Sequence, residues 1–111
     1  MLQYETAVRL YEEISRKAAA RTTEGFDEFY RDFLKNAVDY AATRTAWSFL
    51  TPAERSADDS ARSIRHDGFM TRLSILCSRL GITGIDEILP DRKTRGDFAC
   101  YIALFLALEQ R

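Results

Sequence analysis

The chain has 111 residues, with 16 Lys or Arg against 17 Asp or Glu, a net charge of −1 and few glycines and prolines. A chain of this length is expected to form one domain over residues 1–111 and to bury on the order of 65% of its unfolded surface. The near-neutral charge excludes a bulk attraction to nucleic acid or anionic lipid, and the composition is not that of a disordered linker. Function therefore has to come from local groups of residues.

The predicted cellular location is the cytoplasm, without membrane contact. The first residues contain no basic segment followed by an apolar one, so no secretory signal is expected. No apolar run approaches the roughly 20 residues that a bilayer-spanning helix needs. Cys77 and Cys100 are isolated from each other and lie in apolar surroundings, which favours two reduced thiols in a core.

Two amphipathic helices are predicted in the first half of the chain, over residues 2–20 and 24–49. In the first, apolar residues recur at three- and four-residue spacing, and charged residues fill the opposite face. The apolar face of the second is rich in rings, which come from Phe26, Phe29, Tyr30, Phe33, Tyr40 and Trp47. Both helices are therefore expected to turn one face to a common core.

One charged residue, Arg44, interrupts the aromatic face of the second helix, between Tyr40 and Trp47. A buried guanidinium group is costly unless it is paired or stacked on an aromatic ring. Either Arg44 extends to solvent near the helix end, or it contacts an anion or a partner. Tyr40, Arg44 and Trp47 are therefore a candidate site for a small anionic ligand.

A new helix is predicted to start at Thr51. Threonine can cap it, Pro52 suits the first helical position, and Glu54 stands where a capping box needs it. Residues 53–67 are poor in apolar side chains, which indicates an exposed helical segment or a connection. A break is expected at 67–68, because the apolar faces before and after it differ by roughly 160°. The following helix should end at Gly81, and the pattern leaves open whether residues 52–80 form one helix or two.

Arginines in this region offer a nucleic-acid alternative. If the helix continues through residue 68 without a break, its arginines gather within about a third of the circumference. Three more basic residues begin the final helix, where they oppose the helix dipole. The candidate nucleic-acid contacts are Arg62, Arg65, Arg72, Arg79, Arg92, Lys93 and Arg95. The predicted break and the neighbouring acids disfavour this alternative.

The final helix is predicted over residues 91–109, and residues 98–108 within it contain no charged or strongly polar residue. A helix that is apolar on every side is buried. We therefore expect an all-α bundle of four to five helices, with this hydrophobic C-terminal helix at its centre. Small residues four apart either pack tightly inside the bundle or form a homodimer seam, whose predicted residues are Ala99, Cys100, Ala103, Leu104 and Ala107.

The sequence contains no motif for catalysis, metal or cofactor binding. His66 is the sole histidine, and its neighbours Ser63 and Asp67 in one segment do not make a converging catalytic triad. One histidine and two isolated cysteines do not suit a structural zinc site, and no phosphate-binding glycine loop is present. We expect a non-enzymatic protein-interaction or regulatory module that forms a homodimer, with no metal or cofactor.

Overall fold

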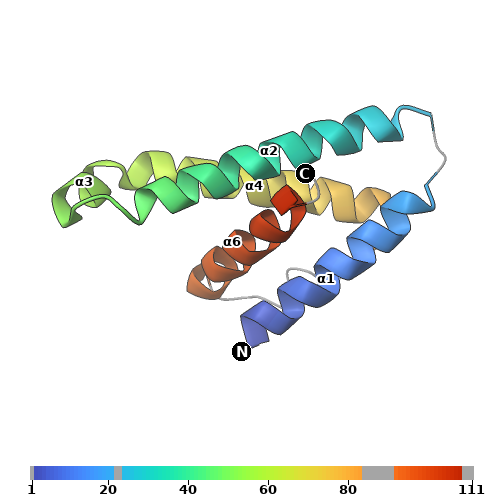
Figure 1. Ribbon diagram of the computed structural model, residues 1–111, viewed down its shortest axis with the longest axis horizontal. Helices are drawn as coiled ribbons and strands as arrows, with labels where there is room; N and C mark the ends of the chain where they lie inside the picture. The colour runs from blue at the N-terminus through green and yellow to red at the C-terminus, as the bar shows by residue number, and fades with distance from the viewer. Residues whose placement is uncertain (1, 22–23, 84–91, 109–111) are drawn as a thin grey trace.

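The computed structural model describes residues 2–21, 24–83 and 92–108, with side chains for residues 4–21, 24–83 and 98–108 (Figure 1). These ranges form five helices and no strand: α1 Leu2–Ala19, α2 Phe26–Trp47, α3 Pro52–Ala57, α4 Asp59–Arg79 and α6 Arg92–Leu108. The predicted all-α helical bundle is therefore confirmed. Among the described helices, none has both the length and the apolar character that crossing a bilayer requires.

Helix α6 is the centre of the bundle, as the sequence predicts. It packs against α1, α2 and α4. Its inward side chains, from Phe98, Ala99, Ile102, Ala103 and Leu106, are 0% exposed. Within the single chain α6 is not covered on every side, because Leu104 is 41% exposed and Leu108 is also exposed. Three helices cover most of α6, and one apolar strip faces outward. The alternative that a second copy covers this strip stays a prediction.

Helices α2 and α4 run antiparallel beside each other and form the long dimension of the molecule (Figure 1). Aromatic stacking joins them at the core. The ring of Phe69 on α4 stacks on Tyr40 of α2 at a centroid distance of 4.7 Å and on Phe33 at 6.0 Å. Such aromatic pairs contribute about 0.5–1.5 kcal/mol beyond the area that they bury. This stack fixes α4 along the inner face of α2.

Rings also join α1 to α6. Tyr4 meets Tyr101 edge to face at 5.5 Å and Phe105 at 5.7 Å, and Tyr11 lies 5.7 Å from Phe105. The apolar face of α1 therefore covers one side of α6. Its charged residues face away from this contact.

The predicted helix start at Thr51 is confirmed. The Thr51 hydroxyl accepts from the Glu54 backbone N–H at 3.2 Å, and Glu54 Oε1 accepts from the Thr51 N–H at 2.9 Å. This reciprocal pair is a capping box, and Pro52 occupies the first turn. The hydrogen bonds from Thr51 hold the pKa of the Glu54 carboxyl below its ordinary value.

The predicted helix end at Gly81 is also confirmed. Gly81 has φ of +76°, which costs a residue without a Cβ little. The Ile82 N–H donates to the Cys77 carbonyl at 2.8 Å, and the Gly81 N–H donates to the Ser78 carbonyl at 3.2 Å. This pair of bonds is the Schellman motif, and it satisfies carbonyls that a helix end would leave unpaired.

The predicted break at Asp67–Gly68 is wrong. Helix α4 passes through both residues, and the interruption lies earlier, at Asp58, between α3 and α4. The prediction assumed that the apolar faces on both sides of Gly68 had to reach one core. Ile64, on the first part of α4, is instead exposed, so no rotation of the chain is needed. A helical glycine costs only about 1 kcal/mol relative to alanine.

Candidate functional site

Residues 42–68, which we call the arm, extend beyond the part of the bundle that α1 and α6 cover (Figure 1). The arm comprises the C-terminal end of α2, the whole of α3 and the first half of α4. Not one of its residues is buried, whereas the core side chains of α2 end at Ala41 and those of α4 begin at Phe69. Contacts within the arm are therefore made outside the hydrophobic core.

Three arginines surround a single tryptophan in the arm. The guanidinium carbons of Arg44, Arg55 and Arg62 lie 4.8, 4.8 and 5.2 Å from the centroid of the Trp47 ring. They come from α2, α3 and α4 respectively, so the turn at Thr51 and the junction at Asp58 bring them together. Each cation–π contact is worth about 0.5–1 kcal/mol at an exposed site. We call these four residues the Trp47 cluster.

The three guanidinium groups of the Trp47 cluster differ in their polar partners. Arg62 forms an ion pair with Asp59 at 2.8 Å, and Arg55 donates to the Ser48 carbonyl at 2.6 Å. For Arg44 and Arg55, no carboxylate lies within ion-pair distance among the residues with described side chains. The cluster therefore has an excess of positive charge around one indole.

Several donor atoms of the cluster lie beneath the surface without a hydrogen-bond partner in the described part of the chain. They are the indole Nε1 of Trp47 and the Nε atoms of Arg55 and Arg62. An unpaired buried donor costs on the order of 1–3 kcal/mol. The Trp47 cluster is thus a region where contacts are incomplete within the chain itself.

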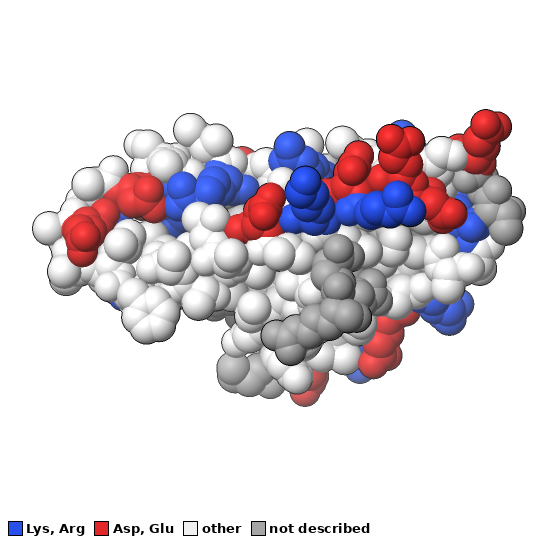
Figure 2. All heavy atoms as spheres, turned by 45° about the horizontal axis from the view of Figure 1, so that its top comes forward, with Lys and Arg blue, Asp and Glu red and all other residues white. Residues whose placement is uncertain are grey.

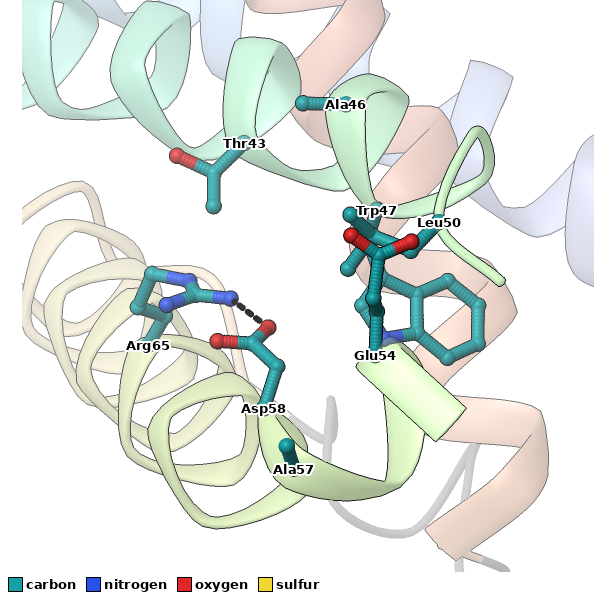
Figure 3. Close-up of a pocket in the computed structure, with 8 residues that line it drawn as sticks. All are labelled: Thr43, Ala46, Trp47, Leu50, Glu54, Ala57, Asp58 and Arg65. Atoms are coloured by element: carbon teal, nitrogen blue, oxygen red, sulfur yellow. Dashed lines mark hydrogen bonds and ion pairs between the residues drawn. The ribbon is translucent and has the colours of Figure 1, made fainter. Parts of the chain in front are cut away.

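A hollow of about 440 Å³ opens beside Trp47 (Figure 3), and we call it the arm hollow. Its lining residues come from the same three helices and their connection: Thr43, Ala46, Trp47, Leu50, Glu54, Ala57, Asp58 and Arg65. Its volume lies within the range of roughly 300–1,000 Å³ that is common for ligand sites. Trp47 belongs to both the hollow and the cluster, so the two adjoin at this residue, although Arg44, Arg55 and Arg62 do not line the hollow.

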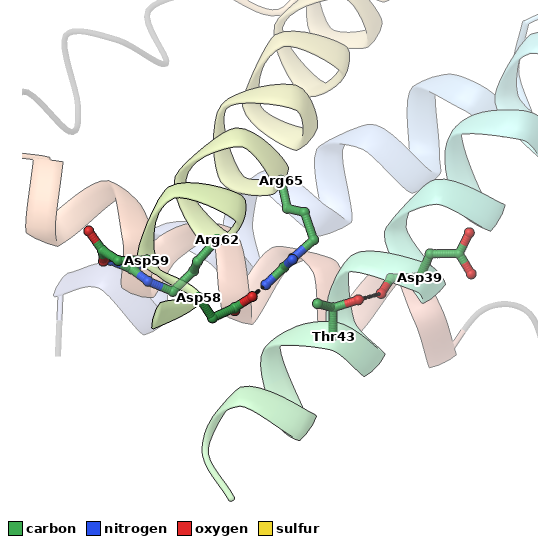
Figure 4. A network of polar contacts seen from close by, with 6 residues as sticks. All are labelled: Asp39, Thr43, Asp58, Asp59, Arg62 and Arg65. Carbon is green, nitrogen blue, oxygen red and sulfur yellow. Dashed lines mark hydrogen bonds and ion pairs between the residues drawn. The ribbon is translucent and has the colours of Figure 1, made fainter. Parts of the chain in front are cut away.

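Ion pairs fix the junction between α3 and α4 (Figure 4). The carboxylate of Asp58, at the junction, accepts from Arg65 at 2.8 Å across one wall of the arm hollow. The second pair, between Asp59 and Arg62, lies within the first turn of α4. Half-exposed pairs of this kind contribute about 0–1 kcal/mol each, so they orient the arm more than they stabilise the fold.

The structure changes the predicted ligand site. Tyr40 is buried in the core, where it stacks on Phe69, and burial raises the pKa of its hydroxyl. The positive charge of Arg44 opposes that rise, so the Tyr40 hydroxyl lies near Arg44, and Arg44 in turn contacts the Trp47 ring. Arg55 and Arg62 also reach the Trp47 ring. Helical spacing within α2 could not identify them, because they reach Trp47 only after the chain reverses direction twice.

Among the candidate nucleic-acid contacts, the four with described side chains each contact another group of the chain. Arg62 and Arg65 are ion-paired, Arg72 donates to the Gly68 carbonyl at 3.3 Å, and Arg79 lies 4.0 Å over the ring of Phe29. The side chains of Arg92, Lys93 and Arg95, at the start of α6, lie outside the described residues. On the face shown in Figure 2, basic and acidic residues alternate along the molecule.

The predicted homodimer seam is only partly on the surface. Ala99 and Ala103 are 0% exposed and belong to the core of the chain itself, so they have no area to offer a partner. Cys100 and Ala107 are half-buried, and Leu104 is exposed. The small residues let α1, α2 and α4 approach α6 closely, which is the packing alternative that the sequence left open.

His66 is the remaining polar residue that the sequence singled out. Its Nδ1 lies 3.2 Å from Oδ1 of its neighbour Asp67, and its Nε2 is buried without a partner among the described residues. Within the same part of the chain, no group of three or more His, Cys, Asp or Glu residues is arranged to hold a metal ion. The Trp47 cluster and the arm hollow therefore form the best-developed polar site in the described structure.

Comparisons with protein-family models, curated proteins and solved structures found no match to this chain. The assignment of a function therefore depends on the arrangement of its own residues.

Proposed function

We propose that this chain is a non-enzymatic, cytoplasmic protein-interaction module and that the arm is its contact surface. The observation that carries the proposal is the Trp47 cluster, in which one indole and three guanidinium groups are assembled from three helices outside the core. Arginine and tryptophan are enriched among residues that dominate binding energy at protein interfaces. An assembly of these side chains contributes little to a fold whose core lies elsewhere.

Exposed apolar side chains in the arm support the same proposal. Phe49, two residues after the end of α2, is 84% exposed, and Ile64 on α4 is also exposed. Single exposed apolar residues are common on protein surfaces. Here, however, they occur in the same segment as the Trp47 cluster and the arm hollow, so the arm offers apolar and cationic contacts together.

The test measures how much of a partner protein is retained by the immobilised wild-type chain and by two immobilised variants. The double variant Trp47→Ala, Phe49→Ser alters the arm, and Ile75→Ser is the control at an exposed apolar residue of α4 outside the arm. We expect a defined partner that the arm variant loses and the control retains, while circular dichroism shows both variants folded. Equal recovery by the arm variant and the wild type would contradict the proposal.

Self-association through α6 is a second candidate, favoured by the exposed strip around Leu104. With Ala99 and Ala103 in the core, a homodimer would use Cys100, Leu104 and Ala107. Light scattering after size exclusion, across a hundredfold range of concentration, measures the molar mass directly. A wild-type dimer that becomes a folded monomer in Leu104→Glu supports this candidate, and a wild-type monomer at every concentration removes it.

A further inference from the structure

We propose that the Trp47 cluster binds carboxylate side chains of an acidic partner segment and that an apolar side chain of the same segment enters the arm hollow. This inference rests on the proposed function, since it names the chemistry of the partner that the arm contacts. Its basis is the combination of uncompensated guanidinium groups, an aromatic platform and an adjoining apolar hollow.

The positive charge of the cluster is the first part of the argument. All three guanidinium carbons lie within 5.2 Å of one ring centroid, and the carboxylate of Asp59 compensates only that of Arg62. Like charges gathered around one ring repel one another, and an incoming anion relieves that repulsion. Arg44 and Arg55 are the two groups best placed to receive it.

The position of the guanidinium groups, 4.8–5.2 Å from the centroid of the indole, supports carboxylate recognition by these arginines. A guanidinium group that stacks on an aromatic ring through its flat face keeps N–H groups at its edge for an anion. Carboxylates match that edge and accept two parallel hydrogen bonds from it. The indole also holds the arginine side chains in place, so part of the entropy cost of ordering them is met before binding.

The arm hollow explains why the partner should carry an apolar side chain beside its acids. Ala46, Leu50 and Ala57 give the hollow apolar walls. The two carboxylates that line it already have partners, because Glu54 accepts from the Thr51 N–H and Asp58 pairs with Arg65. They repel further negative charge, so the acids of the partner are directed to Arg44 and Arg55, and its apolar side chain to the hollow, whose lining residues are drawn in Figure 3.

An acidic protein segment fits these observations better than nucleic acid does. Binding along a phosphate backbone uses a row of cations that neutralises many phosphates. On the visible face in Figure 2, acidic residues interrupt the basic ones, and Arg62, Arg65 and Arg79 of α4 already contact other groups in the chain. The Trp47 cluster is a compact cationic site, which suits a few carboxylates.

The test uses fluorescence anisotropy of short fluorescein-labelled peptides with the full-length chain. The first peptide consists of glutamates interrupted by leucines, the second replaces glutamate by glutamine, and the third replaces leucine by serine. Duplex DNA and inorganic pyrophosphate serve as alternative anions. Because the chain has one tryptophan, a change in Trp47 fluorescence on binding places the ligand at the cluster.

Two protein variants are matched for charge. Arg44→Gln removes a guanidinium group from the cluster, and Arg31→Gln removes an exposed one from the far end of the same helix. We expect Arg44→Gln to weaken binding of the glutamate-leucine peptide by at least about tenfold, because it removes the charge-assisted hydrogen bonds that a carboxylate accepts from this guanidinium group. Arg31→Gln should leave it nearly unchanged, and the serine peptide should bind more weakly.

Four results would overturn the inference: equal binding of the glutamine peptide, equal weakening by both arginine variants, tighter binding of DNA or pyrophosphate than of the acidic peptide, or no binding of the acidic peptide. Failure of the proposed function is a separate outcome. If the acidic peptide fails but the arm variant still loses its protein partner, the arm is the contact surface and only its partner chemistry is misassigned.

Discussion

Two regions of the molecule share the long helices α2 and α4. One is the half around α6 and the other is the arm, and the two differ in the burial of their side chains. Around α6, apolar residues of α1, α2 and α4 interlock, and five α6 side chains are 0% exposed. In the arm, α2 and α4 continue past that core, and no side chain is buried. The comparison separates a region that stabilises the fold from one that is available for binding.

The continuity of α2 and α4 explains how the arm keeps its shape without a core. Both helices are anchored where Phe69 stacks on Tyr40 and Phe33. Beyond that point, short-range contacts hold the arm: the capping box at Thr51, the ion pairs at the α3–α4 junction and the arginines around Trp47. Such contacts are individually weak, so the arm is ordered mainly by its attachment to the core.

The largest predicted difference between the two regions comes from replacing one phenylalanine by alanine in each of them. Phe69→Ala should lower the free energy of unfolding by about 3–5 kcal/mol, because Phe69 is 1% exposed and its removal leaves a cavity. Phe49→Ala should change it by less than about 0.5 kcal/mol, since Phe49 is almost fully exposed. Urea denaturation followed by circular dichroism measures both values, and similar losses in the two variants would erase the distinction between the regions.

The second prediction concerns the pH dependence of the free energy of unfolding, which reports on a thiol buried in the core. Burial, and secondarily the carboxylate of Glu13, raises the pKa of the Cys77 thiol from 9.0 to about 12. The unfolded chain therefore releases this proton at lower pH than the folded chain does. The contribution of the protonated Cys77 thiol to the free energy of unfolding is fully present below pH 9.0. It decreases by about 1.4 kcal/mol per pH unit as the pH rises toward 12.

The measurement is the free energy of unfolding at several values of pH between 8 and 10, for the wild type and Cys77→Ala. The substitution lowers stability at every pH, so the comparison concerns the slope. Burial also raises the pKa of Tyr40, which adds a loss of the same sign at higher pH. A slope unchanged by Cys77→Ala would show that another group dominates the alkaline loss.

Alanine substitutions of the glycine inside α4 and of the glycine that follows its end should have opposite signs. Gly81→Ala is expected to destabilise by about 1 kcal/mol, because φ of +76° is strained for any residue with a Cβ. Gly68→Ala should stabilise by up to about 1 kcal/mol, since Gly68 lies inside the helix. The nearest atom to its added Cβ is at 3.3 Å, on the flexible Arg72 side chain.

Thermal denaturation of both glycine variants gives the two signs. Destabilisation by Gly68→Ala comparable to that of Gly81→Ala would mean that α4 is not continuous at this position and would restore the break expected from the sequence.

The smallest effect on the whole chain should come from Thr51→Ala. Removing the hydroxyl that caps α3 costs on the order of 1 kcal/mol locally, but the arm contributes little to global unfolding. Amide hydrogen exchange should therefore become severalfold faster in α3 while exchange in α6 keeps its rate. Faster exchange of the α6 amides by the same factor would show that the two regions unfold together.

Much of the fold could be predicted from the sequence because its signals are local. Apolar periodicity marks α1 and α2, Thr51 and Glu54 mark the start of α3, and Gly81 marks the end of α4. The central place of α6 follows from its composition, since a helix apolar on nearly all sides has to be covered. These features depend on spacing along one element.

The errors concern contacts between elements. Placing a break at Gly68 presumed one core for the whole of α4, although its first part has none. Ala99 and Ala103 looked like a seam because the sequence does not say how many helices surround α6. Tyr40 and Trp47 lie on one face of α2, but Tyr40 belongs to the core and Trp47 to the arm. The point at which this face leaves the core depends on where α4 packs.

The most direct test of the central claim, that the arm presents uncompensated positive charge around Trp47, is quenching of its fluorescence by iodide and by caesium. Anions concentrate near a cationic site and cations are repelled from it. We predict that iodide quenches the folded chain more efficiently than caesium does, that Arg44→Gln reduces the difference and that Arg31→Gln preserves it. Equal quenching by the two ions, or stronger quenching by caesium, would contradict the account.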